Sequence, residues 1–253
     1  MKEHEEGFSM PLGAPLYQEP PFWGMPKGAL MLMAYKADPE AVAWEVPEPL
    51  EVDEPGLMFA WFSDLSQPTH TIDLYHECVL GIKIRFEDYR GWYIPYIWVD
   101  HDMALTFSRE LYGWPAALCD PTPLRTRGSQ IFGECIRYDE PLMRMSMNVT
   151  SPPPQGREAS IEDEFWQHLD GNWIQVRKLP NPAKGGKPIK QVLNIPPEDF
   201  KINEIWSGPA TLDISKSGRF PNIHNLNALE VLGSWYLKSE WVVPWPEVIW
   251  SNA

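Results

Sequence analysis

Residues 73–99 contain the pattern that most restricts the fold of this chain. An apolar stretch from Asp73 to Ile82 passes into residues 82–87, where apolar and charged side chains alternate strictly. This period of two is typical of a half-buried β-strand. The turn residues Asp88–Gly91 follow, and a second apolar stretch runs from Trp92 to Val99. The pattern predicts a long antiparallel hairpin and, with it, a β-rich protein.

The rest of the chain repeats short apolar stretches between turn residues. Further strands are predicted at Ala29–Tyr35, Leu57–Phe62, 130–138, 142–150, 173–179, 190–195 and 200–214. Helices are predicted at Asp38–Trp44 with Asp38 as cap, at Met103–Tyr112 with Asp100 or Asp102 as cap and Gly113 as its end, and at 226–238. The expected fold class is α+β, mainly antiparallel β, a barrel-like sheet with two or three helices.

The composition predicts an aromatic interior and argues against nucleic acid and membrane surfaces as partners. The 13 tryptophans and 27 prolines favour bent sheets with an aromatic-lined interior, arranged as one domain over residues 1–253 with an extended proline-rich arm at 1–28. A formal net charge of −14 opposes binding to nucleic acid and to anionic membrane surfaces. No secretory signal is expected from residues 1–7, and the sequence has no apolar run of about 20 residues. Its odd number of cysteines indicates reduced thiols, so a cytoplasmic location is expected.

The segment from Ser108 to Leu118 joins the second predicted helix to a Gly-Trp-Pro-Ala-Ala tip. This segment resembles the acetoacetate decarboxylase family. Other segments match that family in the same order along nearly the whole chain. They are Met10-Pro11-Leu12, Tyr35–Ala41, Val46–Glu51, Tyr75-His76-Glu77, Arg109-Glu110, Trp206-Ser207-Gly208-Pro209 with Leu212, Pro244, and Glu247-Val248-Ile249. The resemblance implies an acetoacetate-decarboxylase-like sheet, a small-molecule substrate, and assembly into a homo-oligomer, with the arm as a candidate contact.

The resemblance also shows which reactive groups differ. Where the family has Pro-Lys-Lys, and its first lysine forms a Schiff base with the ketone, this chain has Ala116 and Ala117 after Pro115. A family arginine corresponds to Lys36, and a family glutamate to Ala60. The family's pocket glutamate is retained as Glu77. A roomier and less charged pocket is therefore expected, with one carboxylate, one amine and space for a ligand bulkier than acetoacetate.

The candidate catalytic residues are Glu77 and Lys36, and each has a structural alternative. Glu77 is expected to act as a general acid or base, or else to pair with Lys36 or Arg109 and only support the sheet. Lys36 is expected to bind a substrate carboxylate or to supply a relocated imine. Its alternative is a surface lysine paired with Asp38 or Glu40.

The expected substrate-binding residues surround these two. They are Tyr35, Tyr75, Arg109, Trp114, Ala116 and Trp206. His76 should face away from Glu77, because neighbouring residues on a strand alternate. No cofactor or metal is expected: Asp100-His101-Asp102 and the pair His70 and His76 both lack a convincing third ligand.

Three functions remain open at this point. The first is an enzyme that acts on a carbonyl or carboxylate metabolite by acid–base chemistry, as in isomerisation, dehydration or cyclisation, without an imine. The second is a decarboxylase or aldolase-type lyase that uses Lys36. The third is a non-catalytic small-molecule-binding protein, since loss of an essential lysine fits a repurposed and an inactive enzyme equally.

Overall fold

The structure is a computed structural model that describes residues 7–19, 28–67, 72–120, 122–150 and 158–252. Its helices are α1 (Pro39–Glu45), α2 (Asp102–Phe107), α3 (Glu158–Leu169), the π-helical turn Ser108–Tyr112 and the 3₁₀ turn Ile223–Leu226. Its strands are β1 (Gly28–Lys36), β2 (Glu51–Val52), β3 (Leu57–Gln67), β4 (Ile72–Phe86), β5 (Tyr89–Val99), β6 (Ala116–Leu118), β7 (Arg125–Arg127), β8 (Gln130–Arg137), β9 (Glu140–Asn148), β10 (Asn172–Leu179), β11 (Ile189–Ile195), β12 (Glu198–Ser207), β13 (Ala210–Ile214), β14 (Glu230–Val242) and β15 (Glu247–Ser251).

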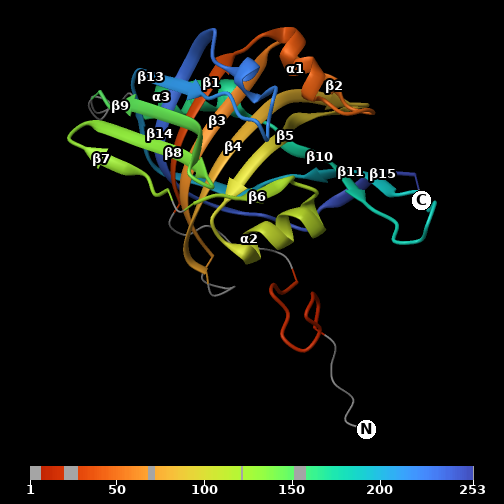
Figure 1. The fold of residues 1–253 in the computed structure, drawn as a ribbon. Coiled ribbons are helices and arrows are strands. Elements are labelled where there is room, and N and C mark those ends of the chain that lie inside the picture. The colour runs from red at the N-terminus through yellow and green to blue at the C-terminus, as the bar shows by residue number, and fades with distance from the viewer. Residues whose placement is uncertain (1–6, 20–27, 68–71, 121, 151–157, 253) are drawn as a thin grey trace.

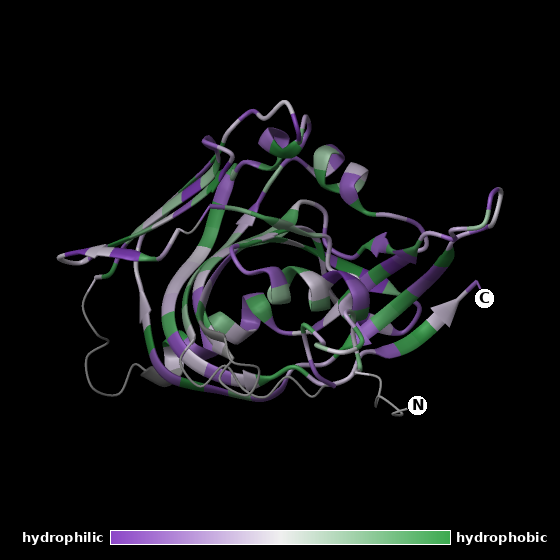
Figure 2. Cartoon of the chain, turned by 60° about the horizontal axis from the view of Figure 1, so that its bottom comes forward, coloured by the Kyte–Doolittle hydropathy of each residue, from purple (hydrophilic) through white to green (hydrophobic). Residues whose placement is uncertain are grey.

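Two sheets, mostly antiparallel, carry the architecture (Figure 1). The larger has the order β12-β14-β1-β3-β4-β5-β10-β11-β15, with β2 paired to β4 and β6 paired to β5. The smaller has the order β13-β9-β8-β7. The larger sheet curls around helical segments (Figure 2), but its described end strands, β12 and β15, do not pair with each other. The α+β class is confirmed, and the expected barrel is an open, curled sheet.

The larger sheet separates two apolar cores. The inner cluster lies on the concave face and includes Leu32, Trp61, Val79, Ile97 and Trp235, together with side chains of α2 and α3. The outer cluster lies on the other face, where strand neighbours of these residues pack against the smaller sheet and α1. Because side chains alternate along each strand, one strand supplies both cores, which accounts for the near-continuous apolar stretches in the sequence.

The predicted hairpin is present as β4 and β5, with its turn displaced from the expected position. Phe86 pairs with Tyr89, so Glu87 and Asp88 form the turn, and Glu87 adopts a φ of 52°. Gly91 lies inside β5 instead. An added Cβ there would lie 2.1 Å from the carbonyl oxygen of Asn172, so glycine permits the close parallel pairing of β5 with β10.

The prediction of a helix at 226–238 is wrong. Only the short 3₁₀ turn Ile223–Leu226 is helical there, and β14 follows it. In β14, Trp235, Leu237 and Trp241 are buried on one face while Lys238 is exposed between them. This is the period-two pattern of a strand, and its aromatic residues favour strands as well.

Three other boundaries differ from the sequence-based expectation. The stretch 200–214 is two strands, because Gly208 and Pro209 interrupt it and send β12 and β13 into different sheets. Helix α3 was not predicted, although its residues Ile161, Phe165 and Leu169 recur at the helical spacing of four. The cap of α2 is provided by the side chains of His101 and Asp102, which both accept from the backbone N–H of Met103.

Only part of the proline-rich arm belongs to the described residues. Within residues 7–19 the chain forms turns, and Tyr17 is buried in the inner cluster, where its hydroxyl donates to Oε2 of Glu110 at 2.7 Å. The arm's remaining residues, 1–6 and 20–27, lie outside the described part. Its role as an oligomer contact stays a prediction.

The chain turns sharply at Gly113, where the π-helical turn ends. Gly113 has a φ of 72°, and an added Cβ would lie 2.8 Å from Cβ and 2.9 Å from Cα of Arg177 on β10. Replacement of Gly113 by alanine is therefore expected to lower the free energy of unfolding by about 2–3 kcal/mol, through both backbone strain and this contact. Urea denaturation of the purified variant measures this difference, and a loss below about 0.5 kcal/mol would show that the turn tolerates a side chain.

Candidate active site

A small cavity lies within the inner cluster, on the concave face of the larger sheet. It is lined by Trp61, Leu65, Tyr75, Glu77, Ile94, Ile97, Phe107, Trp114, Trp173, Trp241 and Val243. The cavity volume is about 30 Å³. Since one water needs about 10–15 Å³ on this measure, the cavity takes a compact group of a few non-hydrogen atoms. The expected space for a bulky ligand is not present.

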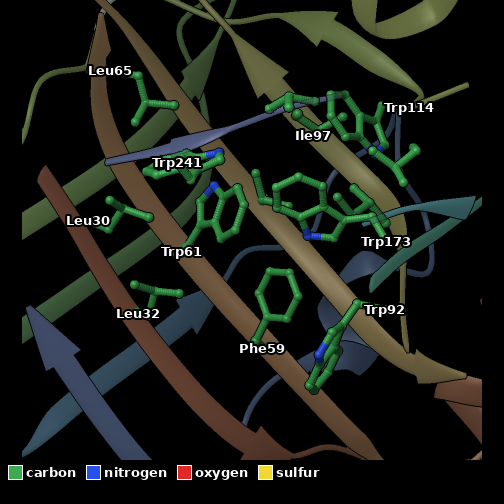
Figure 3. Packing of buried hydrophobic residues seen from close by; sticks show 14 of the residues in the cluster. Leu30, Leu32, Phe59, Trp61, Leu65, Trp92, Ile97, Trp114, Trp173 and Trp241 are labelled. Atoms are coloured by element: carbon green, nitrogen blue, oxygen red, sulfur yellow. The ribbon is translucent and has the colours of Figure 1, made fainter. Parts of the chain in front are cut away.

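Tryptophans form much of the cavity wall (Figure 3). Trp173 contacts Trp61 edge-on with ring centroids 6.3 Å apart, and contacts Trp114 in the same way at 5.6 Å. Trp114 in turn stacks on Tyr112 at 4.6 Å. These contacting rings give the cavity an apolar lining.

Glu77 is the only charged side chain among the described residues that line this cavity. It lies on β4, and the pairing of Ser63 with Glu77 places it beside β3 near Trp61 and Leu65. The hydroxyl of Tyr75 donates a hydrogen bond to Oε1 of Glu77 at 2.8 Å. Glu77 is 9% exposed, and this burial raises its pKa from an ordinary 4.5 to about 7, against the opposing effects of Tyr75 and Trp61. A carboxyl group in this state exchanges protons near neutral pH.

The segment after Gly113 brings the two alanines to opposite faces of the sheet. In β6, Ala116 pairs with Ile97, a residue that lines the cavity, and Ala117 pairs with Trp98. Ala116 is fully buried in the inner cluster, whereas Ala117 packs against the outer cluster. Of the two positions, Ala116 is therefore the one on the cavity side.

Four of the eight predicted site residues come together. Glu77, Tyr75 and Trp114 line the cavity, and Ala116 belongs to the same apolar cluster. Arg109 lies just outside, since its side chain is exposed while its Nη1 donates to the carbonyl oxygen of Ala116 at 3.0 Å. Arg109 therefore fixes the backbone of the tip and does not line the cavity as a substrate-binding residue.

The structure places Lys36 away from this site. Leu30 lies in the same row of the sheet as Ser63 and Glu77, and Lys36 is six residues further along β1. At about 3.3 Å per residue, Lys36 is about 20 Å from that row. Its Nζ lies 3.7 Å from Oε2 of Glu54, and its side chain is 32% exposed. The expected second catalytic group is thus a surface lysine at the end of a strand.

Tyr35, Trp206 and Ala60 also lie elsewhere, because strand alternation turns them away from the concave face. Tyr35 is buried in the outer cluster, where its hydroxyl contacts the sulfur of Met58 at 3.6 Å. Trp206 packs on Tyr236, with ring centroids 5.5 Å apart. Ala60 also belongs to the outer cluster. Because side chains alternate along β3, its neighbour Trp61 lines the cavity instead.

His76 faces away from Glu77, as predicted. Its Nδ1 lies 2.5 Å from Oδ2 of Asp100, and its Nε2 lies 3.7 Å from Oδ1 of Asp64. Burial opposes the charge on His76, but the hydrogen bond and charges of the two aspartates outweigh it, so the pKa of His76 is raised. Asp100 is thus occupied by His76 and does not cap α2. His70, the other predicted histidine, lies outside the described residues.

The tryptophans that the sequence analysis did not assign to the site are Trp61, Trp173 and Trp241. Trp61 was recognisable in principle, because it follows Phe59 at a spacing of two and both belong to the inner face of β3. Trp173 and Trp241 come from β10 and β14, which reach the cavity only through long-range pairing, so local sequence patterns do not reveal them.

Two features of the described residues bear on other functions. None of the described helices is long and apolar enough to cross a membrane. Within the same residues, no three or more histidine, cysteine, aspartate or glutamate side chains gather as they would around a metal ion.

Comparison with known proteins identifies the family. The profile of acetoacetate decarboxylase (ADC) matches residues 9–252. An acetoacetate decarboxylase of Burkholderia cenocepacia (strain HI2424) is 26% identical over 245 residues, which cover 97% of this chain and 95% of the relative. A structure described as "Structural Studies of Acetoacetate Decarboxylase" is similar with a TM-score of 0.84, at 23% identity, over 100% of this chain and 99% of that one.

A further solved structure shares the fold and has a different name. It is the enduracididine biosynthesis enzyme MppR, complexed with the condensation product of pyruvate and imidazole 4-carboxaldehyde. Its TM-score is 0.76 at 20% identity, over 96% of this chain and 95% of that one. Because the family profile covers nearly the whole sequence, this chain belongs to the acetoacetate decarboxylase family.

Proposed function

We propose that this protein is an enzyme that transfers a proton at the carbon next to a carbonyl group of a small carbonyl or carboxylate metabolite. Glu77 is the acid–base group, and no imine forms. The observation that carries this proposal is the single carboxyl group of the described cavity lining, buried among tryptophans and held by Tyr75, with a pKa of about 7. General acid–base catalysis is most effective when the pKa of the group lies near the working pH.

The absence of an amine from the described lining supports a reaction without an imine. A Schiff base needs a lysine of lowered pKa within reach of the ketone. At the position where the resemblance places that lysine, this chain has Ala116, and none of the described lining residues is a lysine. Lys36 is about 20 Å along the sheet from the row of Glu77, so it does not replace the missing amine.

The proposed step is an enolisation. The carboxylate of Glu77 accepts a proton from the α-carbon, the C–H electron pair becomes a C=C bond, and the carbonyl π electrons move onto the oxygen. Protonated Glu77 then returns the proton to the same carbon or to another one. Tyr75 keeps its own proton throughout, because burial and the neighbouring Glu77 raise the pKa of its hydroxyl, and it orients the carboxyl group. Isomerisation, dehydration and cyclisation can all proceed from this enolate.

The size of the cavity and one structural neighbour suggest the class of substrate. The cavity holds a compact group, which suits short 2-oxo and 3-oxo acids. MppR, which shares the fold, is described with a product formed from pyruvate. We therefore use pyruvate, 2-oxobutyrate and acetoacetate as probes.

Hydrogen–deuterium exchange tests the proposal. In D₂O, the protein is expected to accelerate loss of the α-proton signals of at least one probe, followed by ¹H NMR. Because the deprotonated form of Glu77 is the base, the exchange rate should rise with pH up to about 7 and then level off. At pH 5 it should be about 100-fold below the plateau.

A constant rate between pH 5 and 8 would contradict the role of Glu77. Exchange no faster than in buffer for all three probes would contradict enzymatic proton transfer. If a probe binds in the cavity and still exchanges no faster than in buffer, the protein is instead a small-molecule-binding protein.

A further inference from the structure

Three tryptophans of the cavity have indole N–H groups without an acceptor. Trp61, Trp114 and Trp241 are 9%, 8% and 3% exposed, and the Nε1 atom of each is buried with no hydrogen-bond partner. Buried N–H donors are nearly always paired in native proteins, because an unpaired one loses its hydrogen bond to water. Three of them line one cavity, where a ligand can supply the missing acceptors.

Trp92 shows how an indole of the same apolar cluster is satisfied when it does not line the cavity. Its Nε1 donates to the carbonyl oxygen of Asp170 at 3.1 Å. Trp98 and Trp235, which do not line the cavity, also have a buried Nε1 atom without a hydrogen-bond partner. An unpaired indole is therefore not a sign of a ligand by itself, and Trp61 and Trp241 are distinguished by their position at a cavity, where a ligand atom can reach them.

Two of the unpaired donors converge. In Figure 3 the nitrogen-bearing edges of the Trp61 and Trp241 rings are turned toward each other, and both residues line the cavity. The indole of Trp61 also lowers the pKa of Glu77, although it makes no hydrogen bond of ordinary geometry, so it lies close to that carboxyl group. An acceptor atom placed between the two indoles is therefore also near the proposed base.

We propose that the indole N–H groups of Trp61 and Trp241 together bind the carbonyl oxygen of the substrate and stabilise its negative charge in the enolate. This inference rests on the proposed function and specifies how the site works without an iminium. When Glu77 takes the α-proton, the electron pair that moves onto the carbonyl oxygen is held by two neutral donors. Donors fixed in advance in an apolar site are the arrangement that stabilises an oxyanion well.

The chemical class of ligand follows from these donors. The described lining contains no cation, so a permanently charged oxygen would have no counter-charge there. A carbonyl oxygen that gains charge only during the reaction suits two neutral N–H groups. The site should therefore favour enolisable ketones, with any carboxylate of the substrate extending away from the indole pair.

Indole NMR on the intact protein tests the donor pair directly. With ¹⁵N-labelled tryptophan, the Trp61 and Trp241 signals are assigned by Trp61→Phe and Trp241→Phe. Addition of pyruvate, or of oxalate as an analogue of its enolate, should move both N–H proton signals downfield. The Trp92 signal, whose N–H is already bonded, should stay in place. If neither indole signal moves at saturating concentrations of both probes, the proposal is wrong.

Replacement of a single atom provides the second measurement. Benzothienylalanine has the shape of tryptophan with sulfur in place of the N–H group. At position 61 or 241 it should lower the exchange rate about 100-fold or more, the loss typical of one oxyanion donor. At position 92, as the control, the exchange rate should stay within about two-fold. Equal effects at all three positions would show that the indoles act only through their packing, and would overturn the proposal.

The two proposals fail in different ways. If exchange occurs but the indole signals do not move and benzothienylalanine has no effect, Glu77 is catalytic and the donor pair is wrong. If the indole signals move but no probe exchanges, the donor site is present and the proposed enzymatic function is wrong. Glu77→Gln should keep the indole shifts, because it removes the base and not the donors.

Discussion

Replacement of Glu77 by glutamine is expected to lower the rate of α-proton exchange by about 10²–10⁴-fold, the usual contribution of a general acid–base group. Glutamine has nearly the same shape, and its side-chain oxygen can still accept from the hydroxyl of Tyr75. The loss would therefore come from the missing proton acceptor and not from a rearranged cavity. Exchange followed by ¹H NMR at pH 8 compares the variant with the wild type, and full activity of Glu77→Gln would rule out the proposed role.

The stability of the same variant gives an independent check. The folded-state pKa of Glu77 is about 7, above its ordinary value of 4.5, because burial penalises the charged form. The fold therefore favours the protonated group, and this advantage is complete below about pH 4.5 and is lost as the pH rises through 7. At pH 8 the uncharged glutamine should make the protein more stable, by up to about 3 kcal/mol. Thermal unfolding at pH 5 and pH 8 measures this difference, and equal stabilities at pH 8 would indicate that Glu77 is not buried as a charge.

The core of the site could be predicted from the sequence where strand alternation and family resemblance agreed. Glu77 and Tyr75 lie two residues apart on one strand, so they had to share a face, and Trp114 and Ala116 follow a recognisable helix end. Lys36 was assigned to the site because the family has a basic residue there. The register of β1 with β3 places Lys36 away from the site, and this register cannot be read from the sequence of β1 alone.

The long-range part of the fold could not be predicted for a related reason. The curl of the large sheet brings β10 and β14 around to the concave face, and with them Trp173 and Trp241. The local sequence of these strands does not reveal which other strands they pair with. The helix expected at 226–238 is a strand instead, as the alternation of Trp235, Leu237 and Trp241 with more exposed residues indicates.

An amine placed at position 116 is expected to restore imine chemistry. Ala116→Lys puts a lysine on the cavity side of β6, where burial lowers the pKa of its ammonium group, although the charge of Glu77 opposes this. Borohydride reduction with acetoacetate at pH 8 should then leave one covalent adduct on Lys at that position, where the wild type gives none. Overpacking is expected to cost the variant about 1–3 kcal/mol of stability.

Ala117→Lys is the matched control for this experiment. It changes the adjacent residue in the same way, but its side chain lies on the face of the outer cluster, where Ala117 pairs with Trp98. It should therefore give no adduct with acetoacetate. Equal trapping in both variants would show that reactivity does not depend on the cavity, and trapping at position 117 alone would reverse the assignment of the two faces.

Trapping of the wild-type protein during turnover tests the central claim most directly. Borohydride is added while the protein exchanges the α-protons of a probe in D₂O, and the intact mass is then measured. Rapid exchange with an unchanged protein mass is the predicted result, because Glu77 works without a covalent intermediate. A reduced adduct on any lysine of the chain would contradict it, since an amine would then reach the substrate and carry the reaction.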